Sequence, residues 1–207
     1  MKRRYLVGSV GAAAAIALLP SLSTTHTAVA ADVDTTYGAS FPYTRYEAER
    51  GRLDRAHVIS LDERLTVDKM LDSTAIEAGE QSYVELEGEG SSVSFTAEVP
   101  GNAIDLRFTL PDHKAGSVDI RVNGEKAATF NLSSETAYQY VQKSKVFDEE
   151  KDKLAGQGPI HARFQFDEVH ALLNRQVNPG DTVSVIRTGS EGYAYGIDFI
   201  ELEQALP

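Results

Sequence analysis

The stretches Tyr46–Glu49 (YEAE) and Gly196–Glu203 (GIDFIELE) decide the fold of this chain. In both stretches apolar residues alternate with acidic ones, which is typical of a β-strand with one buried face. The first and the last strand of a domain can lie side by side in one sheet. We therefore expect the side chains of Glu47, Glu49 and Asp198 to converge on one cluster of carboxylate oxygens.

The middle of the chain repeats the strand pattern between turn signals. Alternating apolar residues predict strands at Tyr83–Leu86, Val93–Phe95, Ile104–Phe108, Val118–Val122, Glu125–Leu132, Tyr138–Val141, Arg163–Phe166 and Thr182–Arg187. Asn123-Gly124 is the strongest hairpin signal, because both residues tolerate a positive φ. Residues 147–158 predict a long polar loop. Asp167–Asn174 is the one good helix candidate, since its apolar residues recur at helical spacing after two acidic residues. This succession predicts an all-β sandwich of the jelly-roll kind with one short helix.

The first 31 residues are expected to be a secretory signal peptide. The basic residues Lys2–Arg4 precede an alanine-rich apolar run, and Ala28–Ala30 is a small-x-small cleavage signal. The apolar run is short for a membrane span, so no membrane anchor is expected. The arginine pair also fits a twin-arginine signal, so we expect a secreted bacterial protein exported by the Sec or the twin-arginine route. Residues 32–42 predict a flexible leader, and the domain is expected to occupy residues 43–204.

The chain is acidic, with a formal net charge of −11, and it contains no cysteine. A strongly acidic domain repels nucleic acid and anionic lipid, so neither is an expected partner. Neutral sugars and cations remain compatible with this charge. An exported domain without disulfides needs other support, which a bound calcium ion could supply. We expect the domain to be a monomer.

Calcium is the cation that best suits the predicted acidic cluster, since it takes about six to eight oxygen ligands. The expected ligands are Glu47, Glu49 and Asp198, with backbone carbonyls at the remaining positions. The two glutamates point to the same face of a strand, so both can reach one ion. The alternative is a solvent-exposed acidic face that holds no ion. His161 and His170 do not have the spacing of a zinc-binding H-E-x-x-H helix.

The order of these motifs resembles the carbohydrate-binding modules of families 6 and 35. The resemblance rests on the Y-x-A-E opening, the I-D-x-x-x-x-E ending, and the segments RFTLPD, VNG, HARFQFDEV and PGDTV between them. It covers roughly Tyr43–Glu203 and is closest to the family-35-like module at the front of secreted bacterial glucan-degrading enzymes. It implies a galactose-binding-like β-jelly-roll with a structural calcium between its terminal strands. A secreted glycoside hydrolase is the protein partner that it implies.

Tyrosines are the expected sugar platforms, because pyranose C–H faces pack on flat aromatic rings and the chain contains no tryptophan. The expected sugar-binding residues are Tyr138, Tyr140, Tyr193, Tyr195 and Asn123. In the resembling modules an aromatic pair that often includes Trp precedes the terminal strand, whereas Ala194 occupies one of these positions here. The alternative for each tyrosine is a place at the edge of the core.

These observations predict a secreted, non-catalytic module that binds a glucan-like polysaccharide or oligosaccharide, and not an enzyme. One alternative is a small polysaccharide lyase or hydrolase on the same sandwich, which needs an acid–base pair of side chains. Acidic residues are many, but no stretch marks such a pair, and the chain has no G-x-S-x-G motif. The other alternative is a cell-envelope module that holds a protein partner.

Overall fold

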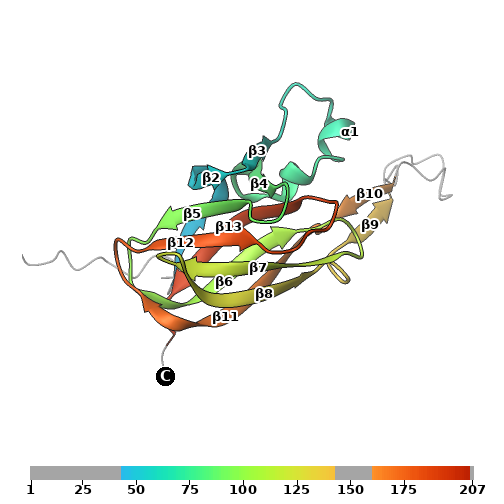
Figure 1. The fold of residues 1–207 in the computed structure, drawn as a ribbon. Helices are drawn as coiled ribbons and strands as arrows, with labels where there is room; N and C mark the ends of the chain where they lie inside the picture. Colours follow the sequence, from blue (N-terminus) through green and yellow to red (C-terminus); the bar gives the residue numbers. More distant parts are fainter. Residues whose placement is uncertain (1–42, 143–159, 206–207) are drawn as a thin grey trace, which may run out of the picture. The chain divides into compact units, whose positions relative to one another are not determined.

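The computed structural model of the protein describes residues 43–142 and 160–205. The predicted signal peptide and leader, and the whole of the polar loop predicted at 147–158, lie outside these residues. Within the described part, two antiparallel sheets pack into a jelly-roll-like sandwich, which confirms the predicted all-β fold (Figure 1). In this part of the chain no helix has the length and apolar character needed to cross a bilayer.

The first sheet is built around the last strand. Its strands run in the order β11-β6-β13-β4-β3, and β1 pairs with β13. Their bounds are β1 Tyr43–Glu47, β3 Ala56–Ser60, β4 Ser82–Leu86, β6 Gly101–Thr109, β11 Phe166–Val177 and β13 Tyr195–Glu203. In the antiparallel β1–β13 pair Glu47 lies opposite Phe199, so the first and last strands are neighbours as predicted.

The second sheet has the order β2-β5-β12-β7-β8. Its strands are β2 Arg52–Asp54, β5 Ser92–Thr96, β7 Ala115–Val122, β8 Glu125–Ser133 and β12 Thr182–Arg187. Asn123 and Gly124 join β7 to β8 with φ values of 52° and 83°, which confirms the predicted hairpin. A separate pair of strands, β9 Gln139–Gln142 and β10 Ile160–Arg163, extends beyond the ends of the two sheets (Figure 1).

The hydrophobic core lies between the two sheets. Alternate residues of most of these strands point into it, and the following side chains are at most 2% exposed: Val84, Leu86, Ile104, Leu106, Ile120, Phe130, Val185, Ile197, Ile200 and Leu202. Burial of a side chain of this size contributes about 1.5 to 3 kcal/mol. The core therefore depends on the period-two pattern that the sequence shows.

Residues 167–174 form the middle of β11, so the prediction of a helix there is wrong. Phe166–Leu172 pairs residue by residue with β6, and burial alternates along the strand. Val169 and Leu173 pack on the core, whereas Leu172 is 66% exposed. The apparent helical spacing counted Leu172 as a buried residue, and pairing with β6 overrides the weak local preference for helix.

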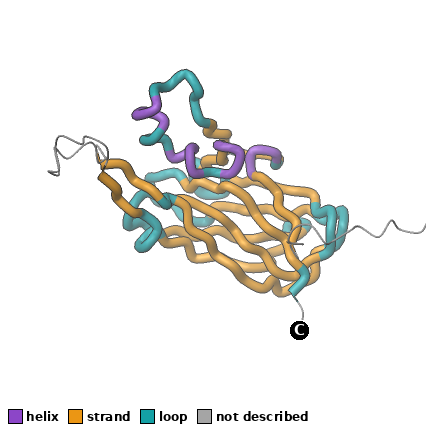
Figure 2. Tube along the Cα trace, turned by 180° about the vertical axis from the view of Figure 1, so that it is seen from behind, coloured by secondary structure: helices purple, strands orange, loops and turns teal. Residues whose placement is uncertain are grey.

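The helical segments of the described residues are short and lie together on one side of the strands (Figure 2). They are η1 Ala48–Arg50, α1 Val67–Met70, η2 Thr74–Glu77 and η3 Gly79–Gln81, where η denotes a 3₁₀ turn. Ala75 and Ala78 of this region pack against Tyr83 and Phe166, which lie on the face of the first sheet opposite the core. Residues 61–81 therefore cover part of that face.

Arg187 is a buried cation at the end of β12, with only 1% of its surface exposed. Its guanidinium donates hydrogen bonds to the carbonyl oxygens of Gly189 and Leu86, both at 2.9 Å, and to that of Glu191. It also lies 4.0 Å from the ring centroid of Tyr195. Because these groups satisfy the buried charge, Arg187 fixes the 188–194 loop against the end of β4.

Replacing Arg187 by methionine is expected to lower the free energy of unfolding by about 3 kcal/mol, because buried carbonyl groups lose their donors. Urea unfolding of the full chain measures this loss. Arg64→Met is the control, because the Arg64 side chain is 90% exposed. A loss no larger for Arg187→Met than for Arg64→Met would contradict the structural role.

Candidate functional site

Asp198 lies at the point where β13 changes its neighbour. Residues 195–197 of β13 pair with β4, and residues 199–203 pair with β1. The pairing of β13 with β6 shifts register between Ile197 and Phe199, so Asp198 is the extra residue of a β-bulge. Bulges re-aim side chains out of the regular alternation. The Asp198 side chain is fully buried as a result, at 0% exposure.

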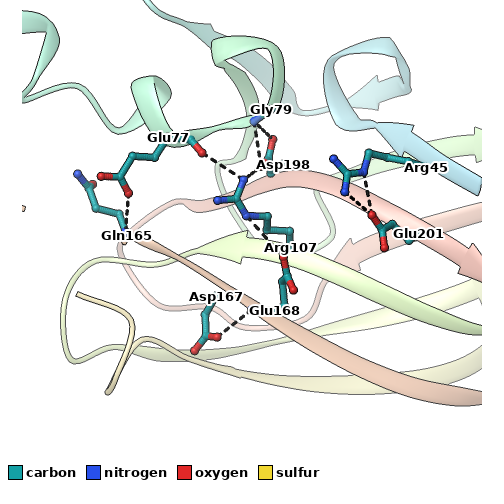
Figure 3. Close-up of polar contacts among 9 residues, drawn as sticks. All are labelled: Arg45, Glu77, Gly79, Arg107, Gln165, Asp167, Glu168, Asp198 and Glu201. Carbon is teal, nitrogen blue, oxygen red and sulfur yellow. Dashed lines mark hydrogen bonds and ion pairs between the residues drawn. The ribbon is translucent and has the colours of Figure 1, made fainter. Parts of the chain in front are cut away.

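The carboxylate of Asp198 has partners from two other elements (Figure 3). It accepts hydrogen bonds from the backbone N–H of Gly79, at 2.9 and 3.1 Å, and it forms an ion pair with Arg107 of β6. The same guanidinium donates to the carbonyl oxygen of Glu77 at 3.1 Å. Arg107 therefore joins the first sheet to the η2–η3 turns.

Two glutamates lie beside this pair without comparable partners. Oε2 of Glu47 and both carboxylate oxygens of Glu49 are buried and have no hydrogen-bond partner. A Cβ atom added to Gly79 would lie 3.0 Å from Oε2 of Glu47 and 3.3 Å from Oδ1 of Asp198. Glycine at this position therefore lets two carboxylates approach the same backbone.

The electrostatics of the cluster follow from burial and like charge. Burial raises the pKa of Glu47, and the charges of Asp198 and Glu49 raise it further. Burial likewise raises the pKa of Glu49, with added repulsion from Glu80 and Asp198. For Asp198 burial also raises the pKa, although the Gly79 N–H and Arg107 oppose it. The cluster is thus short of positive charge.

The sequence prediction placed Glu47 and Glu49 on one strand face, and the structure differs in detail. β1 ends at Glu47, and Glu49 lies in the 3₁₀ turn η1. Across residues 43–142 and 160–205, no three or more His, Cys, Asp or Glu side chains are already gathered as a metal site. The orphaned carboxylate oxygens of both glutamates are nevertheless the hard donors that calcium prefers, so their chemistry fits this ion.

A cavity of about 550 Å³ borders the cluster at Glu47. Glu47 and Glu98 line it together with Arg45, Arg50 and Arg52. Arg45 donates to Glu201 at 2.8 Å through Nε, and Arg50 forms an ion pair with Glu80. Arg45 and Arg50 are therefore engaged with other carboxylates, and the positive charge of Arg45 only partly offsets the rise in the pKa of Glu47.

The predicted sugar-binding tyrosines form two pairs. The rings of Tyr138 and Tyr140 lie 6.3 Å apart, and those of Tyr193 and Tyr195 lie 6.1 Å apart. Tyr140 is 57% exposed, whereas Tyr195 is fully buried at 0% and packs on Arg187. The structure thus presents Tyr140 to solvent and holds Tyr195 in the core.

Asn123 does not join these tyrosines. Its amide donates to Asp181 at 2.8 Å and accepts from the N–H of Thr182 at 2.9 Å, so it holds a turn. The hydroxyl of Tyr193 donates to the carbonyl of Ala115, at the opposite end of β7. Eight residues of strand separate these two ends by roughly 26 Å.

Asp105 belongs to a second carboxylate group that the sequence did not single out. It lies on β6 directly opposite Glu201 of β13 and His170 of β11. Its Oδ1 atom is buried without a hydrogen-bond partner. Burial raises the pKa of Asp105 to about 6, aided by the charges of Glu168 and Glu201 and opposed by His170.

The Asp105 carboxyl could therefore take up or release a proton near neutral pH, as one member of an acid–base pair must. Asp105, Glu168 and Glu201 lie on the face of the first sheet that points away from the core. Neither the 550 Å³ cavity nor a second cavity, of about 330 Å³ and lined in part by Tyr138, is lined by Asp105, Glu168 or Glu201. In the sequence, Asp105, His170 and Glu201 are only polar positions on three separate strands. That they are neighbours follows from the strand order and not from the sequence.

Comparison with known proteins identifies relatives of the whole domain. A family model described as the alpha-1,3-glucanase catalytic domain D1 matches residues 40–205. No curated protein matches the chain. The match covers both terminal strands and every other strand of the sandwich.

Solved structures give the same result. The Agl-KA catalytic domain is 34% identical, with a TM-score of 0.65, and the catalytic domain of a GH87 alpha-1,3-glucanase in complex with nigerose is 25% identical, with a TM-score of 0.67. The catalytic unit of the thermostable GH87 alpha-1,3-glucanase from Streptomyces thermodiastaticus strain HF3-3 is 27% identical, with a TM-score of 0.60. Each covers 82% of this chain, whereas the chain covers 29%, 29% and 27% of them respectively.

These findings correct the function expected from sequence. The prediction of a non-catalytic module of families 6 and 35 is wrong, and so is the prediction that the protein is not an enzyme, because the matching family is a glucanase catalytic domain. The predicted link to glucan-degrading enzymes is confirmed, and the hydrolase alternative is the better supported one. The physical reason is that the quoted motifs specify terminal strands and turns, and a sandwich fold does not determine its function.

Asp105→Asn is expected to raise the midpoint of thermal unfolding by about 3 °C at pH 7.5 and to leave it nearly unchanged at pH 4. The unfolded carboxyl has a pKa of about 3.9, so the folded protein holds the extra proton between that pH and about 6. The contribution of Asp105 to the free energy of unfolding is therefore fully present below pH 4 and is lost as the pH rises through 6. An amide carries no charge and avoids this loss.

Thermal unfolding of the variant and the wild type at both pH values measures the difference. Asp54→Asn is the matched control, because Asp54 is an exposed aspartate on β2. Equal midpoints for the wild type and Asp105→Asn at pH 7.5 would contradict the role of Asp105.

Proposed function

We propose, since the chain belongs to the family of the alpha-1,3-glucanase catalytic domain D1, that it works in a glycoside hydrolase that cleaves α-1,3-glucan. The match over residues 40–205 is the observation that carries this proposal. Related catalytic domains have been solved in complex with nigerose and with tetrasaccharides. The substrate proposed here is accordingly a polysaccharide or oligosaccharide of α-1,3-linked glucose.

In this proposal the described sandwich is a part of the catalytic unit. Hydrolysis of a glycosidic bond needs a proton donor and a second carboxylate on opposite sides of the bond. Asp105 and Glu201 are neighbours on a sheet face and line neither of the two cavities. The chain spans 29% of the Agl-KA catalytic domain. We therefore do not assign the acid–base pair to Asp105 and Glu201.

Structural calcium at Glu47, Glu49 and Asp198 is the second part of the proposal. Three buried carboxylate oxygens without hydrogen-bond partners support it, together with raised pKa values caused by burial and mutual repulsion. A bound calcium ion would supply the missing positive charge. It would also link η1 to the bulge of β13, where the pairing strands change.

Export of the protein is the third part. A polymeric glucan is too large to enter a cell, so a hydrolase that attacks it must act outside. The basic n-region Lys2–Arg4 and the alanine-rich run that follows support secretion. Sec and twin-arginine export both remain compatible with this leader.

The hydrolase proposal is tested by reconstitution. The full chain is added to a relative's catalytic domain from which the D1 part has been removed, and the release of reducing ends from α-1,3-glucan is measured. We expect the chain to raise the rate by at least about tenfold, and to have no effect on α-1,4-glucan. Equal rates with and without the chain would refute this assignment.

The calcium proposal is tested by thermal unfolding in EDTA and in calcium. Calcium at about 100 times its dissociation constant adds about 2.7 kcal/mol, which is a shift of roughly 5 to 10 °C. The double variant Glu47→Gln, Glu49→Gln should lose this shift and should unfold above the wild type in EDTA, because buried like charges are removed. The control Glu87→Gln changes an exposed carboxylate and should keep the full shift. A shift that survives the double substitution would exclude this site.

A further inference from the structure

A cavity of about 330 Å³ lies where β4, β6 and β13 meet the turn η2 and the residues before β9. Its walls come from segments far apart in the chain. The lining residues on which the following steps depend are Thr74, Tyr83, Glu85, Thr109, Tyr138 and Ala194. The volume is at the lower end of the range of about 300 to 1,000 Å³ that is typical of small-molecule sites.

The two threonine hydroxyls of the cavity use their hydrogens inside the protein. Thr109 donates to the carbonyl oxygen of Gln165 at 2.8 Å, and Thr74 donates to the side-chain oxygen of the same residue at 2.7 Å. Gln165 is itself buried, with 5% exposure, so this arrangement is held in place. Each threonine oxygen keeps lone pairs that can accept a hydrogen bond.

The two tyrosine hydroxyls of the cavity also donate their hydrogens to acceptors within the protein. Tyr138 donates to the carbonyl oxygen of Leu110 at 2.8 Å, and Tyr83 donates to Oε1 of Glu85 at 3.1 Å. Glu85 contributes a carboxylate whose side chain is 30% exposed. The polar part of the cavity therefore consists of hydrogen-bond acceptors, and a ligand has to bring the donors.

The charge of the lining narrows the class of ligand. Among the described residues that line the cavity there is no lysine or arginine, and Glu85 is acidic. Phosphate, sulfate and uronic acids are therefore unfavourable occupants. The rings of Tyr83 and Tyr138 and the side chain of Pro111 add flat apolar surface. A ligand with several hydroxyl donors and C–H faces, such as a neutral pyranose, matches both the acceptors and the rings.

We propose that this cavity is an accessory subsite that holds a glucose residue of the α-1,3-glucan chain away from the point of cleavage. This proposal rests on the function proposed above, which supplies the substrate. Tyr138 packs on the sugar ring, while Glu85 and the hydroxyl oxygens accept hydrogen bonds from sugar hydroxyls. Ala194 leaves the mouth open, where a large aromatic side chain would fill it.

Tyr140 extends the same surface beyond the cavity. Its ring lies 6.3 Å from that of Tyr138, it is 57% exposed, and its hydroxyl donates to Asp112 at 2.6 Å. The next residue of a bound chain can pack there. A second contact on the same polymer raises the local concentration of substrate at the hydrolase without any change at the cleavage site.

The test is a binding titration of the full chain with nigerose and with longer α-1,3-linked glucose oligosaccharides, followed by NMR or calorimetry. We expect binding that tightens with chain length, that is lost in Ala194→Trp, and that weakens about tenfold in Glu85→Gln. The matched control is Ser190→Trp, an exposed position in the same loop that should bind as the wild type does. Thermal midpoints confirm that each variant is folded. If Ala194→Trp does not fold, the test rests on the weaker binding expected for Glu85→Gln.

Three outcomes would overturn the subsite. They are no binding of any α-1,3-linked oligosaccharide, equal binding by Ala194→Trp and Ser190→Trp, and tighter binding of glucosamine than of nigerose, which would indicate an ammonium site at Glu85. The reconstituted hydrolase assay separates this proposal from the previous one. Hydrolysis without binding to the isolated chain would remove the subsite and leave the proposed function intact.

Discussion

The antiparallel pairing of β1 with β13 is the constraint on which the rest of the structure depends. It brings residues from the two ends of the domain into contact, and it places β13 between β6 on one side and β4 and β1 on the other. Because β4 and β1 share one edge of β13, the strand must change partners along its length. The bulge at Asp198 marks that change and turns a carboxylate into the protein interior. Its buried negative charge there needs a cation and hydrogen-bond donors.

Compensation for Asp198 explains several features of the surrounding structure. Arg107 reaches it from β6 and then bonds the carbonyl of Glu77, and Gly79 donates its backbone N–H. One guanidinium balances one carboxylate, so Glu47 and Glu49 keep buried oxygens without partners. The calcium ion proposed above would neutralise this pair, which otherwise buries negative charge against negative charge.

One sandwich fold supports different functions in different proteins, so sequence motifs that specify the fold do not specify the function. The terminal motifs, the Asn123-Gly124 turn and the 107–112 segment report strand pairing and turn geometry, which the structure confirms. They do not report what lies beyond the sheets. The family match assigns the chain to a glucanase catalytic domain, which motif order alone could not distinguish from a binding module.

The amino-acid sequence by itself determined the β-strands with strict alternation and the β7–β8 hairpin, because these depend on local periodicity and on turn residues with positive φ. Tertiary structure decided the remainder. Residues 167–174 form a strand because β6 offers an edge, and Tyr195 is buried because Arg187 lies over its ring. The charge array around Asp105 and the acceptor-lined cavity beside Tyr138 arise from residues distant in the chain. Their environments exist only after the sheets have assembled, so no local pattern encodes them.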